Sequence, residues 1–279
     1  MPKYTLITGA SEGLGKAFAL ECARRHMNLI LVALPGIELY QLASYIRRRY
    51  SVNVCELETD LSVERNCYSL WKTIREHQLD VNMLINNAGI GGTRLFDSAE
   101  FSHWQKHIQI NVTGTAYLTH LFLPELKKNG PSYILNVSSL AVFFFVPGKQ
   151  VYGATKSFIH FFSKSLRREI KKDNIRVSVL CPGGILSNPA QYLQNNNSSW
   201  ISRSSAMLPD AVAAIAIKAL LQGKETIIPG RWNRFFIWLD RILPAFIKEK
   251  LICRQAVNMK QNYSDSWTTG TLSPIQKTA

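Results

Sequence analysis

Short apolar runs alternate with longer amphipathic stretches along most of the chain. Seven runs are apolar and β-prone, which predicts strands at residues 4–8, 29–33, 52–57, 81–86, 133–137, 175–180 and 226–228. Six stretches space their apolar positions as helices do, at residues 16–26, 37–50, 62–77, 102–126, 152–171 and 211–220. Because the strand runs are almost continuously apolar, we expect helices to cover both faces of the sheet.

This alternation predicts an α/β fold with a doubly wound parallel sheet in three layers. We expect a single catalytic domain over residues 1–230. Within it, the polar stretch 187–208 is predicted to be either a lid on the site or a surface loop. A basic aromatic extension follows at 231–260, and the polar tail 261–279 is predicted to be disordered.

Composition adds exclusions to this picture. The chain has 279 residues, of which 46% are hydrophobic and 19% charged, as in globular proteins. Its five cysteines form no C-x-x-C pair, so we expect neither a disulfide framework nor a metal site. No signal-peptide pattern and no apolar run of membrane-spanning length is visible, so a cytoplasmic protein is expected, with peripheral membrane contact left open.

The formal net charge of +14 raises the question of an anionic partner. The cations sit in small groups at 47–49, 167–172 and 231–254, and no nucleic-acid-binding motif accompanies them. We therefore expect no nucleic acid. In 231–254 the cations alternate with aromatic and aliphatic residues, and Pro244 divides the segment in two. Such a segment suits a membrane interface, a cover for the substrate site or an oligomer contact.

A glycine-rich turn follows the first predicted strand. It reads Thr8-Gly9-Ala10-Ser11-Glu12-Gly13-Leu14-Gly15 and opens the first predicted helix. Glycines in this setting let backbone N–H groups approach a pyrophosphate at the helix N-terminus. The strand before it and the helix after it favour a dinucleotide site over a turn without a ligand.

The chain resembles the short-chain dehydrogenase/reductase family over residues 3–230. The family's TGxxxGxG, NNAG, helix Asn, strand-end Ser, YxxxK and PG motifs match, in order, Thr8–Gly15, Asn86–Gly89, Asn111, Ser139, Tyr152–Lys156 and Pro182-Gly183. The resemblance implies a Rossmann fold, a bound NAD or NADP, a small carbonyl or alcohol substrate and a homodimer or homotetramer. It also implies that Asn111 anchors a water linking Lys156 to solvent.

The same residues make chemical sense together. Tyr152 and Lys156 are four apart and share one face of a helix. A free phenol has a pKa of about 10, and we expect the ammonium to lower it toward neutral pH. Ser139 would hydrogen-bond the substrate oxygen, and Tyr152 would give its proton to the developing alkoxide during reduction. The expected catalytic set is Asn111, Ser139, Tyr152 and Lys156.

The cofactor is expected to contact residues at the ends of several strands. These are Gly9, Ser11, Glu12, Gly13, Leu14, Gly15, Leu34, Asp60, Leu61, Asn87, Ala88, Gly89, Tyr152, Lys156, Pro182, Gly183, Ile185 and Ser187. Ala33 and Leu34 stand where an acid would select NAD and an arginine NADP, so both cofactors stay open. Asp60 is interpreted as an adenine contact or a turn residue.

The run Leu140–Pro147, with three consecutive phenylalanines, lies between Ser139 and Tyr152. It favours an apolar substrate or, equally, packing of the loop on the core. Two other functions compete with catalysis. One is a nucleotide-binding sensor without activity, against which the intact Ser139, Tyr152 and Lys156 argue. The other is a basic protein that binds a membrane or nucleic acid, an alternative that the aromatic residues near the C-terminus support.

Overall fold

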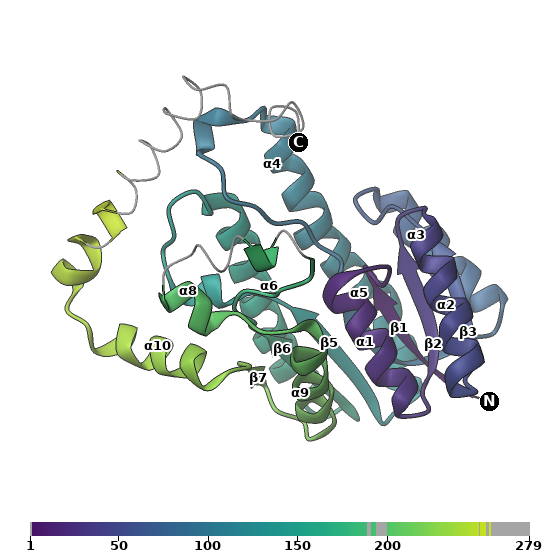
Figure 1. Ribbon diagram of the computed structural model, residues 1–279. Coiled ribbons are helices and arrows are strands. Elements are labelled where there is room, and N and C mark those ends of the chain that lie inside the picture. The colour runs from purple at the N-terminus through teal and green to yellow at the C-terminus, as the bar shows by residue number, and fades with distance from the viewer. Residues whose placement is uncertain (1, 189–190, 194–199, 251, 255–256, 258–279) are drawn as a thin grey trace.

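A computed structural model describes residues 2–188, 191–193, 200–250, 252–254 and 257. Its centre is a seven-stranded sheet in the order β3-β2-β1-β4-β5-β6-β7 (Figure 1). All of the strand pairs are parallel. The strands are β1 (Lys3–Thr8), β2 (Asn28–Ala33), β3 (Val54–Glu58), β4 (Asp80–Asn86), β5 (Ser132–Val137), β6 (Ile175–Leu180) and β7 (Thr226–Ile227). This is the doubly wound Rossmann-type sheet that the apolar pattern predicts.

Helices connect the strands and lie on both faces of the sheet. They are α1 (Gly13–Arg24), α2 (Ile37–Tyr50), α3 (Glu64–Glu76), α4 (Phe101–Ile108), α5 (Thr115–Lys128), α6 (Gln150–Glu169), α8 (Trp200–Ser205), α9 (Pro209–Leu221) and α10 (Arg231–Ile242). A short 3-10 helix, Leu140–Phe143, follows β5. The predicted and observed bounds agree for α2 and β6 and differ by a few residues at the ends of other elements, where apolar spacing carries the least information.

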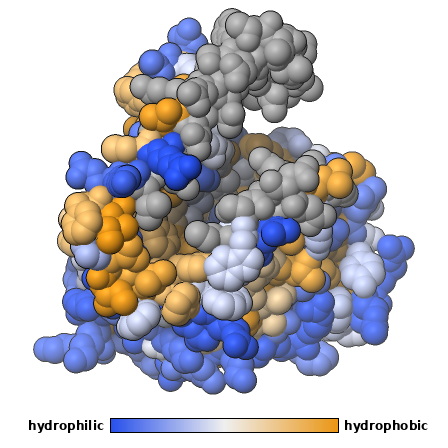
Figure 2. All heavy atoms as spheres, turned by 60° about the vertical axis from the view of Figure 1, so that its left-hand side comes forward, coloured by the Kyte–Doolittle hydropathy of each residue, from blue (hydrophilic) through white to orange (hydrophobic). Residues whose placement is uncertain are grey.

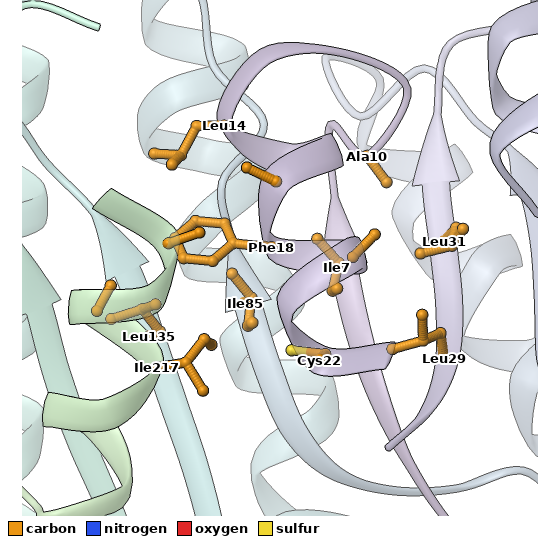
Figure 3. Close-up of a cluster of buried hydrophobic side chains, with 14 of the residues drawn as sticks. Ile7, Ala10, Leu14, Phe18, Cys22, Leu29, Leu31, Ile85, Leu135 and Ile217 are labelled. Carbon is orange, nitrogen blue, oxygen red and sulfur yellow. The ribbon is translucent and has the colours of Figure 1, made fainter. Parts of the chain in front are cut away.

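The sheet separates two hydrophobic cores because successive strand side chains point to opposite faces. Ile7, Leu29 and Leu31 join α1, α2 and α9 on one face, whereas the neighbouring Leu6 and Ile30 join α3, α5 and α6 on the other. Figure 3 shows the first core, in which the Phe18 ring of α1 fills the space toward α9. Parallel strands buried on both sides hold their carboxyl ends at one edge, where the glycine-rich turn lies.

One predicted element is divided in the structure. Residues 102–126 were expected to form one helix, but α4 and α5 are separated by a π-helical turn, Gln109–Gly114. The turn buries Asn111 and Gly114. A β-carbon added at Gly114 would lie 2.9 Å from the Leu61 carbonyl oxygen, so this close approach of two backbones needs a glycine. Apolar spacing does not distinguish a wide turn from a regular one.

The C-terminal part of the described chain departs from the sheet. Figure 1 shows α10 running along the side of the molecule, below α8. After Pro244, residues 245–250 are helical again. No helix among the described residues is both long and apolar enough to cross a membrane. The tail 261–279 lies outside the described residues, as do parts of 187–208 and 231–260.

Candidate active site

The glycine-rich turn is shaped by backbone conformation and close contact. Gly9 and Gly13 have φ of +64° and +53°, in the left-handed region that favours glycine. A β-carbon added at Gly15 would lie 1.8 Å from the Gly9 carbonyl oxygen. The first turn of α1 is therefore in direct contact with the turn before it, and a larger residue at position 15 would displace backbone.

The turn is fastened to the end of β4 through Thr8 and Asn87. The Thr8 hydroxyl accepts hydrogen bonds from the backbone N–H groups of Asn87 (3.0 Å) and Ala88 (2.9 Å). The Asn87 amide donates in return to the carbonyls of Thr8 (2.9 Å) and Gly9 (3.2 Å). These bonds explain why threonine and asparagine stand at these positions, because they fix the two loops that meet at the edge of the sheet.

A cavity of about 410 Å³ opens above these loops. Twelve of the residues predicted to bind the cofactor line it, namely Gly9, Ser11, Glu12, Gly13, Leu14, Gly15, Leu34, Leu61, Asn87, Ala88, Gly89 and Ser187. It is also lined by residues that the sequence analysis did not select: Ala33, Thr59, Ile90, Ile110, Asn188 and Gln191. The size of the cavity, the glycines of the turn and the N-terminus of α1 fit a dinucleotide.

Tyr152, from α6, lies against the loop that follows β4, and neither Tyr152 nor Lys156 lines the cavity, although both were predicted to bind the cofactor. A β-carbon added at Gly91 would lie 3.1 Å from the ring carbon Cε2 of Tyr152. Ser139, two residues after β5, lies close enough to the phenol to lower its pKa. Its hydroxyl also accepts from the Ala141 backbone N–H at 3.1 Å, so it caps the 3-10 helix as well. The structure thus brings two of the predicted catalytic residues close together.

Lys156 lies deeper, fully covered by the protein. Its Nζ donates to the Val137 carbonyl at 2.9 Å and lies 6.0 Å from the centre of the Tyr152 ring. Burial lowers the pKa of Lys156 to about 8. Burial also raises the pKa of Tyr152 above its usual value, and the Ser139 side chain opposes that rise. This direction is opposite to the one expected from the sequence, because desolvation of the phenol outweighs the ammonium at that distance.

Asn111 is held by three hydrogen bonds of its side chain. The amide oxygen accepts from the Ile90 N–H, and the amide nitrogen donates to the Ile90 carbonyl and the Thr155 hydroxyl, each at 3.0 Å. A β-carbon added at Gly89 would lie 2.8 Å from the Asn111 amide oxygen and 3.2 Å from Lys156 Nζ. Asn111 therefore positions the loop after β4 directly beside Lys156.

Asp60 matches the turn interpretation more closely than the adenine one. Its carboxylate accepts from the backbone N–H (2.9 Å) and the hydroxyl (2.7 Å) of Ser62. Asp60 does not line the cavity, although its neighbours Thr59 and Leu61 do. An Asp two residues before a Ser is a common turn pattern, which is the signal for this role.

The loop after β6 reaches the cavity only in part. Pro182 accepts a hydrogen bond from the Leu140 N–H at 2.7 Å, and Ile185 pairs with Met207 in an isolated parallel bridge. Neither of them, nor Gly183, lines the cavity. A β-carbon added at Gly13 would lie 3.2 Å from the Ser187 hydroxyl, so Ser187 covers the glycine-rich turn.

The phenylalanine run divides between its two predicted roles. Val142 and Phe143 pack against the small buried cluster of Ile159, Val179 and Cys181. Phe145, in contrast, is 86% exposed. One end of the run is thus core packing, while the other presents an apolar ring to solvent.

Lys149 is a site residue that the sequence analysis missed. Its Nζ lies 5.1 Å from the centre of the Tyr152 ring, nearer than Lys156, and burial lowers its pKa. Its place three residues before Tyr152, at the N-cap of α6, was the available signal. Among the described residues, no group of three or more His, Cys, Asp or Glu side chains could hold a metal.

Comparison with known proteins places this geometry in context. The family model for short chain dehydrogenases matches residues 3–198. The 11-beta-hydroxysteroid dehydrogenase-like 4A of Arabidopsis thaliana is 30% identical over 250 residues, which cover 89% of this chain and 83% of the relative. The very-long-chain 3-oxoacyl-CoA reductase of Mus musculus is 30% identical over 270 residues, covering 94% of this chain and 82% of the relative.

A solved structure gives the same match in three dimensions. The short-chain dehydrogenase from Sphingobium yanoikuyae in complex with NADPH is 27% identical, with a TM-score of 0.73. The match covers 88% of this chain and 97% of that protein.

Proposed function

The chain belongs to the short-chain dehydrogenase/reductase family, and on this premise we propose that it interconverts an apolar ketone and its secondary alcohol, with Tyr152 as general acid and base. It is an NAD(P)-dependent oxidoreductase acting on CH–OH and C=O groups. The observation that carries the finer proposal is the placement of Tyr152 beside Gly91 and of Lys156 beside Gly89, in the loop after β4 whose Gly89 lines the nucleotide-sized cavity.

At neutral pH the phenol carries the proton that reduction requires, since burial raises its pKa above the usual value. In the reducing direction, Tyr152 gives this proton to the substrate oxygen as negative charge develops there. The Ser139 hydroxyl would donate its single O–H to the same oxygen. Lys156 remains fixed by the Val137 carbonyl and, with its pKa of about 8, replaces the proton from its own ammonium.

The bound nicotinamide ring supplies the hydride for reduction or accepts it in oxidation. The residues that would hold the dinucleotide are those of the glycine-rich turn, the loop Asn87–Gly89 and Ser187, all of which line the cavity. Ala33 and Leu34 present no charge at the end of β2, so neither NAD nor NADP is selected there.

An apolar substrate is supported by two observations. Two of the relatives are named for a steroid and for a very-long-chain 3-oxoacyl-CoA. On this chain, the loop that follows Ser139 ends in the exposed Phe145 ring. Such a ring favours binding of a hydrophobic body next to the reacting carbonyl.

Replacing Tyr152 with Phe tests the proposal. We expect Tyr152→Phe to lower kcat by about 10²–10⁴-fold, since the proton donor is lost while the ring still packs on Gly91. Binding of the nicotinamide nucleotide should persist in the variant, as measured by its fluorescence. Tyr68→Phe, at a half-exposed position on α3, is the matched control and should leave kcat unchanged. A Tyr152→Phe enzyme with full kcat would exclude the proposed role.

We also propose a homo-oligomer assembled through α4 and α6. These helices expose Phe101, Ile108, Phe158 and Phe161, and Phe161 is 74% exposed. A charge placed among apolar rings at an interface is costly to bury. Phe161→Glu should therefore lower the mass measured by light scattering, whereas Tyr40→Glu on α2, an exposed aromatic elsewhere, should not. An unchanged mass for Phe161→Glu would place the contact elsewhere.

A further inference from the structure

Helix α10 exposes a mixed basic and apolar face. Six side chains on this face are exposed, and we call them the α10 surface: Arg231, Arg234, Phe235, Trp238, Arg241 and Ile242. Their spacing of three and four residues places them on one side of the helix. Trp238 is 57% exposed although its indole is among the largest apolar groups of the chain.

The opposite face fixes the helix to the protein. Asn233 and Ile237 are buried there. The Asn233 amide donates to the carbonyls of Pro229 at 2.8 Å and Ser205 at 3.2 Å. The buried Asn233 therefore fixes the orientation of α10, and the α10 surface faces solvent.

Apolar exposure continues after Pro244. In the helical residues 245–250, Phe246 is 71% exposed and Ile247 is also exposed. Lys248 forms an ion pair with Asp240 of α10 at 2.9 Å, which ties this segment to the helix. Figure 2, which brings this side of the molecule forward, shows orange apolar side chains gathered on it with blue hydrophilic ones at their edges.

The charge of the region is strongly positive. Residues 231–250 contain five cations and two carboxylates, Asp240 and Glu249. Because Lys248 neutralises Asp240, no unpaired carboxylate lies on the α10 surface itself. Arg231, Arg234 and Arg241 therefore present their charge together with the exposed rings.

We propose that the α10 surface docks on the headgroup layer of an anionic lipid bilayer. Trp and Phe place apolar rings at the boundary of headgroups and acyl chains, while arginines pair with lipid phosphates. A second copy of this chain fits less well, because a two-fold contact would set the same arginines against each other. This inference goes beyond the proposed function and does not depend on it.

Docking would take place next to the loop that follows β6, since a β-carbon added at Gly183 would lie 2.9 Å from the Asn233 amide nitrogen of α10, and Ser187 of that loop lines the cavity. Trp200 of α8 packs its ring 5.3 Å from Trp232 and 6.0 Å from Phe236, measured between ring centres. Both partners belong to α10, so the helix that meets the bilayer also supports the segment before Met207. A hydrophobic substrate dissolved in the bilayer would thus lie close to the site.

Vesicle flotation of the full chain tests the proposal. The protein should float with vesicles that contain phosphatidylglycerol and remain in the soluble fraction with pure phosphatidylcholine. Arg234→Glu combined with Arg241→Glu should lower binding to the anionic vesicles by at least about tenfold. Trp238→Ser should also lower it, through loss of the apolar anchor. Retained nucleotide binding verifies that each variant is folded.

The matched control carries the same change of charge elsewhere. Arg48→Glu combined with Arg49→Glu alters two exposed arginines of α2 and should leave vesicle binding close to that of the unmodified chain. An equal loss in this control would overturn the proposal in favour of unspecific charge attraction. Absence of flotation at low salt would overturn it too, as would a lower oligomeric mass of the α10 variants without vesicles, which would indicate a second copy on this surface.

A second measurement is independent of charge reversal. Lipids brominated near the headgroup quench tryptophan fluorescence only at short range. We expect quenching in anionic vesicles that is reduced in Trp238→Phe, a change that keeps an apolar ring on the surface. Quenching that is the same in both proteins would contradict an interfacial Trp238.

Discussion

Two regions around the proposed site are built in different ways: the cavity beside β1 and β4, and the aromatic cluster of α8 and α10, which does not line that cavity. Beside β1 and β4, the surface consists mainly of backbone and small residues, with Gly9, Gly13 and Gly15 in close contact. In α8 and α10, large aromatic side chains such as Trp200 and Trp232 pack on one another at the protein surface. In the first region a larger side chain at a glycine would clash with backbone, so the shape is fixed. In the second region surface aromatic side chains pack on one another and can be replaced with less disturbance.

This difference separates two tasks of one site. A nucleotide phosphate is bound by backbone N–H groups, so its recognition needs an unvarying local shape. An apolar substrate is bound by surface area, which many combinations of rings can provide. We therefore expect substitutions beside β1 to abolish nucleotide binding, and substitutions in α8 to change the affinity for the substrate only moderately.

The largest effect is expected at Gly15. In Gly15→Ala the new β-carbon would meet the Gly9 carbonyl oxygen at 1.8 Å, so backbone must move. We expect the free energy of unfolding to fall by about 4 kcal/mol or more and nucleotide affinity to fall at least about a hundredfold. Chemical denaturation and fluorescence titration measure the two.

Gly153→Ala is the control for this variant. At Gly153 an added β-carbon meets nothing within 4 Å, and helix propensity favours alanine there. Stability should be unchanged or higher. If Gly15→Ala were as stable as this control, the rigid contact in the turn would be refuted.

Lys156 should give a smaller effect that depends on pH. Its pKa is about 8 in the folded protein and about 10.5 in the unfolded chain. Between these values the unfolded chain holds a proton that the folded protein has released, so Lys156 makes the free energy of unfolding rise with pH. The rise would total about 3 kcal/mol between pH 8 and 10.5.

The buried thiols act in the opposite direction above pH 9, because burial raises the pKa of Cys22 and Cys181 to about 12. Comparison with Lys156→Met cancels their contribution, since both proteins contain them. Urea denaturation at a series of pH values should show that the free energy of unfolding of the wild type, minus that of Lys156→Met, increases between pH 8 and 10.5. A difference independent of pH would mean that Lys156 is not desolvated.

The smallest effect is expected in α8. Trp200→Ala removes two ring contacts from a residue that is half-exposed, each worth about 0.5–1.5 kcal/mol. We expect KM for an apolar ketone to rise several-fold with nucleotide affinity unchanged. Tyr68→Ala, which loses a surface ring contact with Trp71, should change neither. A parallel loss of nucleotide affinity in Trp200→Ala would show that the two regions are coupled.

The same contrast explains what could be predicted from the sequence. The parallel sheet follows from strand runs that are apolar on both faces, and the loops around Gly15 and Asn87 follow from residue types with few substitutes. The π-helical turn around Asn111 depends on how helices meet, which apolar spacing does not encode. Lys149, by contrast, was missed although its position three residues before Tyr152 offered a signal. The predicted direction of the pKa shift of Tyr152 was also wrong, because the burial of the phenol can be judged only from the three-dimensional structure.

The contact between α1 and α9 has a consequence for how the chain reaches this structure. Phe18 is fully buried in a core that includes Ile217, close to the other end of the sheet domain (Figure 3). During synthesis the ribosome makes residue 217 long after residue 18, so this aromatic ring must wait without its final neighbours. Contacts so distant in sequence also slow folding. The newly made N-terminal half would therefore expose apolar surface, and chaperones would be needed mainly before α9 is synthesised.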